Sequence, residues 1–102
     1  MTIQITSVIT RPDTNTSWKP PGIVGWYLSN QHFLDTWYEK GRLLSNTWTE
    51  GELSATSVRT FIDQQAFIDF VSDPLLQETR NQRDAYHTLH DLVTISTDII
   101  EI

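Results

Sequence analysis

The 102-residue sequence predicts an α+β fold, a four-stranded antiparallel sheet with helices on one of its faces. Three observations carry this prediction. Apolar and polar residues alternate near both ends of the chain, over residues 3–10 and 93–102, which is the period of a strand with one buried face. A glycine within residues 49–52 marks a hairpin between two further strands. Two capped helical segments, at 63–71 and 74–90, separate this hairpin from the last strand.

The first strand is expected at residues 3–10. Ile3, Ile5 and Ile9 share one face of such a strand, and the residues between them make the other face mostly polar. Residues 11–28 contain prolines and glycines without periodicity, so we expect a long loop there. The aromatic residues in or beside this loop are Trp18, Trp26 and Tyr27. Because large rings seldom remain in water, we expect a functional loop rather than a linker.

A helix is expected next, at residues 29–41, which begin with a serine suited to the N-cap and end with a glycine suited to the C-terminal stop. Two strands follow, at residues 43–48 and 53–61. Gly51 lies between them and can adopt the positive φ that a tight hairpin requires. The two strands are therefore predicted to pair antiparallel.

Two aspartates define the next two helices. Asp63 can accept a hydrogen bond from the free backbone N–H groups of the helix at 63–71. Asp73 does the same for the helix at 74–90, whose first position is Pro74, where proline is best tolerated. The inward stripe of this longer helix is weak and comprises Leu75, Leu76, Thr79, Arg83, Tyr86 and Leu89 or His90.

The elements form a single predicted domain over residues 1–102, in the order strand, helix, strand, strand, two helices, strand. This is the order of a ferredoxin-like βαββαβ fold whose second helix is split in two. We expect the helix-side face of the sheet to carry Ile3, Ile5, Ile9, Leu53, Ala55, Phe61, Val93, Ile95 and Ile99. We expect the opposite face to carry Thr6, Val8, Thr10, Ser54, Thr56, Val58, Thr60, Thr94, Ser96 and Asp98.

This second face must meet water or another molecule, because the helices cover only the first. It is neither charged like a solvated face nor apolar like a core, and only Arg59 or Asp98 is a charged residue near it. Threonine packs well on a pleated surface and keeps a hydroxyl available. We therefore expect a homodimer that forms through this face.

The composition limits the classes of partner. Thirteen acidic against seven basic side chains give a formal charge of −6, which opposes binding to nucleic acid and to anionic membranes. The absence of cysteine excludes disulfides and thiolate metal sites. The sequence shows neither a signal peptide nor an apolar run long enough to span a membrane, so we expect a soluble cytoplasmic protein.

The second half of the chain resembles a known family. The segment Phe61-Ile-Asp-Gln-Gln-Ala-Phe-Ile-Asp-Phe-Val-Ser-Asp-Pro74, followed by a helix with Arg80 and Arg83-Asp-Ala-Tyr86, is similar to the second half of dimeric α+β barrel proteins. The resemblance covers residues 42–102, and the first half agrees only in element order. It implies that two copies place their sheets face to face. The superfamily includes cofactor-free, antibiotic-biosynthesis-type monooxygenases, haem-degrading enzymes and members without known activity, and this chain resembles the last group, for which no cofactor is expected.

Candidate ligand-binding residues lie on the expected second strand and in the aromatic loop. Asn46 and Trp48 alternate on the strand and are expected to face the barrel interior beside the threonines, as cavity-lining groups or as packing. The full candidate set is Trp26, Tyr27, Asn46, Trp48, Thr56 and Val58. No catalytic residue is assigned, because serines and aspartates are scattered without a nucleophile motif.

The end of the longest expected helix carries four potential metal ligands. His87, His90, Asp84 and Asp91 are spaced so that some of them share a helix face. No second cluster of ligands completes a coordination shell, and histidine also suits the negative end of a helix dipole. The sequence therefore predicts no metal.

These observations favour a homodimeric ferredoxin-like domain that binds a small molecule or serves as a structural interaction module. One alternative is a cofactor-independent monooxygenase acting on an aromatic or polycyclic substrate in the barrel cavity. Another is a viral or assembly subunit that docks through the aromatic loop at residues 11–28. The sequence contains no motif that decides among them.

Overall fold

The computed structural model describes residues 1–18 and 34–102. Its elements are β1 (Ile3–Thr10), a helical stretch at residues 34–39, β2 (Leu43–Glu50), β3 (Ser54–Phe61), α2 (Gln64–Ser72), α3 (Pro74–His90) and β4 (Val93–Glu101). The ferredoxin-like order predicted from the sequence is confirmed. The start of the expected helix at residues 29–41 lies outside the described residues.

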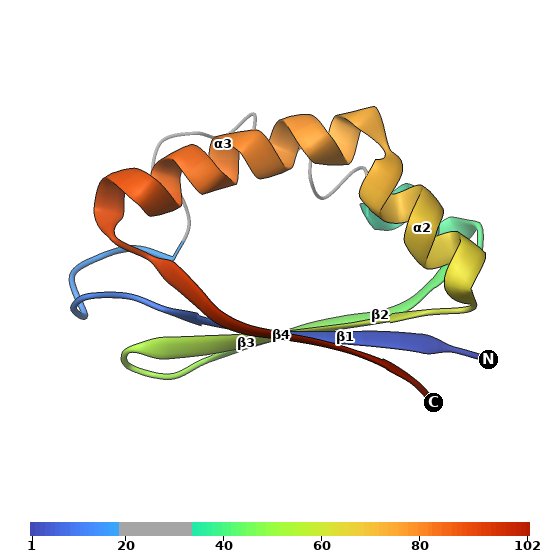
Figure 1. Ribbon diagram of the computed structural model, residues 1–102, viewed down its shortest axis with the longest axis horizontal. Helices are drawn as coiled ribbons and strands as arrows, with labels where there is room; N and C mark the ends of the chain where they lie inside the picture. Colours follow the sequence, from blue (N-terminus) through green and yellow to red (C-terminus); the bar gives the residue numbers. More distant parts are fainter. Residues whose placement is uncertain (19–33) are drawn as a thin grey trace.

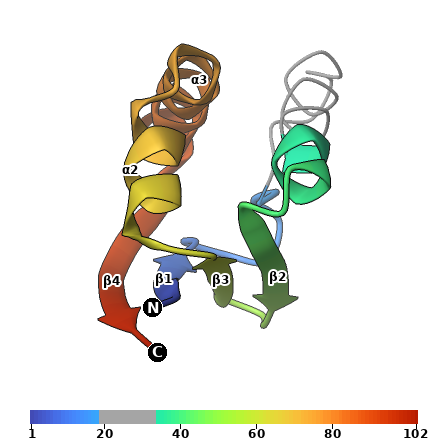
Figure 2. The same ribbon diagram turned by 90° about the vertical axis from the view of Figure 1, so that its right-hand side faces the viewer.

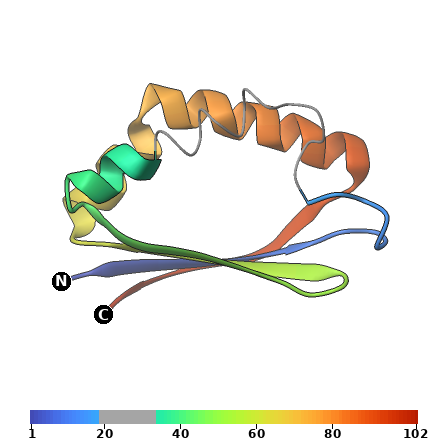
Figure 3. The same cartoon turned by 180° about the vertical axis from the view of Figure 1, so that it is seen from behind.

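All four strands form one antiparallel sheet in the order β2-β3-β1-β4. The first strand is therefore central and the last is an edge, as the end-on view shows (Figure 2). The chain termini lie together at one end of the sheet, and the β2–β3 hairpin lies at the other (Figure 3). A backbone hydrogen bond of 3.0 Å from Ile102 to Thr2 extends the pairing of the edge strand.

Helices cover one face of the sheet, and no described residue covers the other (Figure 1). The main core forms where α2 and the 34–39 helix meet the sheet, and its buried members are Ile3, Leu34, Trp37, Leu43, Phe61, Ala66, Phe70 and Leu76. Phe61 and Phe70 are the largest of its fully buried side chains, and their ring centroids are 5.0 Å apart. A second cluster of Ile9, Trp18, Ala55 and Leu92 lies at the other end of the sheet.

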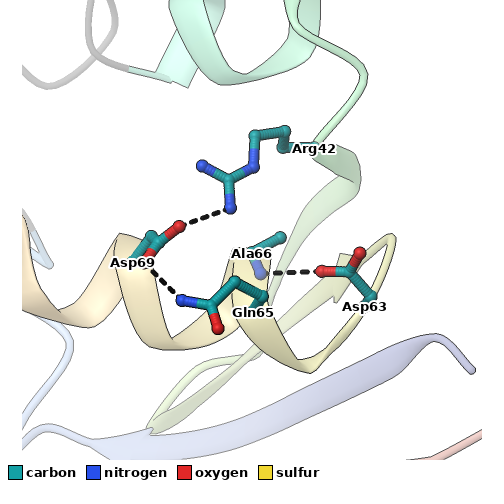
Figure 4. Close-up of polar contacts among 5 residues, drawn as sticks. All are labelled: Arg42, Asp63, Gln65, Ala66 and Asp69. Carbon is teal, nitrogen blue, oxygen red and sulfur yellow. Dashed lines mark hydrogen bonds and ion pairs between the residues drawn. The ribbon is translucent and has the colours of Figure 1, made fainter.

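Both predicted aspartate caps are present. Asp63 Oδ1 accepts a hydrogen bond of 2.8 Å from the backbone N–H of Ala66 at the start of α2 (Figure 4). Asp73 Oδ1 accepts one of 2.9 Å from Leu75 at the start of α3. Each cap satisfies an N–H group that has no partner within its own helix.

An ion pair on the surface of α2 connects that helix to the start of β2. Arg42 Nη2 lies 2.6 Å from Asp69 Oδ2, and Gln65 Nε2 donates to the other oxygen of Asp69 at 2.8 Å (Figure 4). The hydrogen bond from Arg42 is the main reason that the pKa of Asp69 lies below its usual value. The Arg42 guanidinium also stacks 4.8 Å from the ring centroid of Trp37.

The strand register corrects the predicted faces at β4. The pairing shifts between Val8 and Ile9, so that Ile9 lies opposite Thr94 and Thr10 opposite Val93. Because a register shift of one residue exchanges the two faces, Thr94 joins the helix side and Val93 the open side, the reverse of the prediction. The β-bulge responsible leaves no mark in the alternating pattern.

Two further predictions about packing were wrong. Leu53 precedes β3 and is 50% exposed, because the chain is still turning there. Leu75 and Leu89 are exposed on α3, whereas the less exposed residues of that helix include Arg80 and His87. Within residues 1–18 and 34–102, no helix combines the length and apolar character needed to span a membrane.

Candidate functional site

The helix-side face of the sheet carries a row of residues from three strands. Asn46 of β2 lies opposite Arg59 of β3, which lies opposite Ile5 of β1. Directly opposed residues of antiparallel strands project from the same face. Since the buried residues Ile3 and Phe61 belong to this face, Asn46 and Arg59 lie under the helices.

The candidate residues predicted from the sequence divide between the two faces. Trp48 lies opposite Ser57 and shares the helix side with Asn46. Thr56 and Val58 lie on the open face, opposite Val8 and Thr6. The sheet therefore separates the two pairs, and Asn46 and Trp48 do not lie beside the threonines. Trp26 and Tyr27, the other candidates, are outside the described residues.

Trp48 is part of an aromatic pair at the hairpin end of the sheet. Its ring meets that of Trp18 edge to face, with centroids 6.0 Å apart, and its Nε1 donates to Glu50 Oε1 at 2.8 Å. Trp18 is buried, and the Arg11 guanidinium lies 4.7 Å from its ring centroid. Trp48 remains 39% exposed, so part of its ring is accessible to a ligand.

Arg59 is the most unusual residue of the covered face. Its Nε donates to Asn46 Oδ1 at 3.2 Å, and its guanidinium carbon lies 5.3 Å from the ring centroid of Phe70. Burial, and after it the nearby charges of Arg83 and Arg80, lower the pKa of Arg59 to about 10. The fold thus places a guanidinium where its charged form is disfavoured.

Two more guanidiniums come from the inward side of α3. Arg80 and Arg83 follow the buried residues Leu76 and Thr79 at helical spacing, so the four side chains share one face. Burial lowers the pKa of Arg80, and the charge of Arg83 adds to this effect. Arg59, Arg80 and Arg83 together form the arginine cluster.

The cluster has few acceptors among the residues that the structure describes. Arg80 Nε is buried without a hydrogen-bond partner there. Arg83 pairs with Asp84 at 3.1 Å, but that carboxylate is 61% exposed and the pair is on the surface. An unpaired buried donor is costly, and the nearby like charges that lower the pKa values of Arg59 and Arg80 add to that cost.

Two neighbouring groups, Tyr38 and His87, have shifted pKa values. Burial raises the pKa of the Tyr38 hydroxyl, and Arg59 opposes this effect while Asp35 reinforces it. The hydroxyl therefore remains protonated at neutral pH and can donate a hydrogen bond. Burial and the charge of Arg83 lower the pKa of His87. His87 is therefore mainly neutral at pH 7 and can accept a proton.

The lowered pKa of His87 predicts a pH effect on stability. The charged form of His87 is disfavoured in the folded state, so protonation favours unfolding. The stability that the neutral side chain provides is fully present above pH 6.5 and is lost as the pH falls below that value. We expect the free energy of unfolding to fall between pH 7 and pH 5, and to fall less in His87→Gln. Urea denaturation at each pH measures this.

The matched control for this experiment is His90→Gln. His90 lies one turn away on the exposed end of α3, and its ring is 4.5 Å from that of Tyr86. The control should keep the pH profile of the unaltered protein. Identical profiles for His87→Gln and His90→Gln would contradict the role assigned to His87.

Other parts of the described surface offer weaker candidates. Residues 1–18 and 34–102 contain no group of three or more histidine or carboxylate side chains that could hold a metal ion. A surface pocket of about 410 Å³ is lined by Thr36, Trp37, Lys40, Arg42, Asp69, Asp73 and Leu75. Its central charges, Arg42 and Asp69, already neutralise one another, so they offer no free charge to a ligand.

Sequence reasoning did not identify the arginine cluster, although two signals pointed to it. Arg59 alternates with Phe61 and therefore shares its face once β3 is assigned. Arg80 and Arg83 stand four and seven residues after Leu76, which is the spacing of a single helix face. What joins the two signals is the packing of α3 over the sheet, and this requires the tertiary structure.

Solved structures share the complete architecture. SnoaB, a cofactor-independent oxygenase from Streptomyces nogalater, superposes with a TM-score of 0.64 over 99% of this chain and 92% of its own, at 8% sequence identity. A conserved protein from Methanosarcina mazei Go1 gives a TM-score of 0.65 over 99% and 92% of the two chains, at 10% identity.

A dimeric ferredoxin-like protein of unknown function from Jannaschia sp. CCS1 gives a TM-score of 0.55, covering 97% of this chain and 99% of that one at 11% identity. No protein-family model and no curated protein matches the sequence. At these identities the likeness shows the fold alone, which is ferredoxin-like.

Proposed function

We propose that the protein is a homodimer in which each copy binds a small organic molecule between the helix-side face of the sheet and α3. The observation that carries this proposal is the arginine cluster. A purely structural interior would place apolar side chains at Arg59 and Arg80, because replacing buried charges with packed apolar groups is often neutral or stabilising. Charged groups with shifted pKa values that gather in one place are more typical of binding and catalytic sites.

Asn46 and Trp48 complete the proposed site. Asn46 holds the Nε of Arg59 at 3.2 Å, which orients the guanidinium. Trp48 lies two residues further along the same face of β2, which is about 7 Å away along a strand, and offers a partly exposed ring. A ligand that combines a polar group with an aromatic ring matches this pairing.

Titration calorimetry with a panel of aromatic compounds, including anthrone-like compounds and naphthalene derivatives, tests the ligand proposal. At least one compound should bind the unaltered protein, and Trp48→Ala should weaken the binding of that compound about fivefold, since an aromatic contact of this kind contributes about 1 kcal/mol. Thr56→Ala, on the opposite face of the same sheet, is the control and should leave the affinity unchanged.

Three observations support the homodimer. The open face carries hydroxyl-bearing and β-branched side chains but no covering element among the described residues. The edge strand β4 and the residue after it also expose large apolar side chains, namely Val93, Ile95, Ile99, Ile100 and Ile102. Apolar surface of this extent on an edge strand requires a covering partner or risks aggregation. The similar protein from Jannaschia sp. CCS1 is described as dimeric.

A second candidate function is cofactor-independent oxygenation. The specific observation in its favour is a neutral His87 beside cationic Arg83, because such a pair can take a proton from an acidic C–H or O–H group and stabilise the resulting anion. The fold is similar to that of SnoaB, a cofactor-independent oxygenase. Oxygen consumption with anthrone-like substrates decides between the two, and turnover that is absent with every substrate would leave the binding function.

A further inference from the structure

We propose that the arginine cluster selects the ligand by its negative charge, and that the natural ligand is an aromatic carboxylate. This inference rests on the proposed function, since it names the chemical class that the same site takes. The chain as a whole has a formal charge of −6, yet Arg80 and Arg83 lie close enough to Arg59 to lower its pKa, and the carboxylate that pairs with Arg83 is exposed on the surface. Local positive charge in an acidic protein is the signature of a site for an anion.

The hydrogen-bond donors of the cluster indicate a carboxylate. Arg80 Nε has no acceptor among residues 1–18 and 34–102, although it is buried. The Arg59 guanidinium donates to Asn46 Oδ1 through Nε, so this hydrogen bond leaves both terminal nitrogens for other acceptors. A guanidinium presents its N–H groups as a planar fork that matches the two oxygens of a carboxylate. One carboxylate would satisfy these donors and reduce the repulsion among the three cations.

The surroundings of the cluster favour an anion that carries a ring. The Phe70 ring lies against the Arg59 guanidinium, and Tyr38 is close enough that ionisation of its hydroxyl raises the pKa of Arg59. Trp48 follows Asn46 on the same face, with part of its ring uncovered. An inorganic anion would use the guanidiniums but none of these rings, whereas an aromatic carboxylate uses both.

Titration calorimetry of 2-naphthoate against 2-naphthamide tests the inference directly. The two probes have the same ring system and nearly the same shape, and they differ in charge. We expect the acid to bind at least about tenfold more tightly than the amide, because charge-assisted hydrogen bonds are stronger than neutral ones. The difference should shrink as salt is added, since the attraction is partly screened.

Arg80→Gln should bring the affinity for 2-naphthoate close to that for the amide. Arg42→Gln is the matched control, because Arg42 pairs with Asp69 on the surface of α2 and lies outside the cluster. The control should keep the preference for the acid. Thermal unfolding shows whether each variant folds, and Arg80→Gln should melt no lower than the unaltered protein, because it removes a cation that burial and Arg83 disfavour.

Four outcomes would overturn proposals, and they are distinguishable. Equal affinity of the unaltered protein for acid and amide would overturn the charge selection and leave the ligand site intact. A preference for the acid that survives both Arg80→Gln and Arg83→Gln would place the anion elsewhere. Inorganic phosphate that binds as tightly as 2-naphthoate and displaces it would show that the site takes an anion without using the rings, and would overturn the aromatic part of the inference. Failure of every aromatic probe, charged or neutral, would overturn the proposed function and this inference together.

Discussion

Phe70→Ala is expected to lower the free energy of unfolding by about 3–5 kcal/mol. Phe70 is 1% exposed, and its ring centroid lies 5.0 Å from that of Phe61 and 5.2 Å from that of Trp37. It therefore joins α2, the sheet and the 34–39 helix at one point. Truncation leaves a cavity that the rigid sheet beneath it cannot close, so the loss includes a cavity contribution in addition to the lost burial.

Phe67→Ala provides the control for this substitution. Phe67 lies one turn earlier on α2 and is only partly buried, although its ring centroid is 5.8 Å from that of Phe61. Urea denaturation should give it a smaller loss than Phe70→Ala. An equal or greater loss for Phe67→Ala would contradict the central position assigned to Phe70. Because the Phe70 ring also lies against the Arg59 guanidinium, Phe70→Ala should weaken ligand binding as well, whereas Phe67→Ala should not.

The fold was accessible from the sequence because its signals are local. Asp63 and Asp73 each cap a helix with a side chain that reaches only two or three residues ahead. The hairpin depends on the few residues between two adjacent strands. The alternation of apolar and polar residues in β1 directly indicates which face of that strand is buried. Signals of this range are complete within a short window, so no knowledge of the tertiary structure was needed.

The faces of β4 were harder to predict, and the reason is physical. Val93 and Thr94 exchange faces because of a bulge that arises in the pairing with β1, and pairing is not encoded in β4 alone. Its apolar residues also remain exposed although the pattern suggested burial, since an edge strand lacks a neighbour on one side. Apolar alternation indicates that one face of a strand is suited to burial, but it does not identify the molecule that buries it.

The candidate site depends on long-range contact to a still greater degree. Asn46 was identified as a site residue from its position on a strand, but its partner Arg59 is thirteen residues away along the chain. Arg80 and Arg83 belong to α3 and influence Arg59 only because that helix returns across the sheet (Figure 1). Polar residues on an inward face look like defects of an amphipathic pattern until they are seen to converge. That convergence is the reason to treat them as a site.

In the proposed dimer, Val58→Arg is expected to raise the dissociation constant about 100-fold or more, because an unpaired charge buried at an interface costs roughly 3–5 kcal/mol. Val58 lies on β3, between Thr47 of β2 and Thr6 of β1, near the middle of the open face. A two-fold axis would give each copy the same arginine, so that the interface would bury two like charges. Sedimentation or light scattering over a range of micromolar concentrations measures the change.

Gln82→Arg adds the same side chain on the exposed side of α3 and should leave the dimer unchanged. Thermal unfolding separates dissociation from unfolding, because position 58 is on the surface of an isolated copy and tolerates arginine there. If the unaltered protein is a monomer at these concentrations, the homodimer is overturned. If Val58→Arg remains as dimeric as the Gln82→Arg control, the interface does not lie on the open face. The exposed apolar residues of β4 would then be the next surface to examine, with Ile99→Arg and Ile100→Arg placing the charge on its two faces in turn.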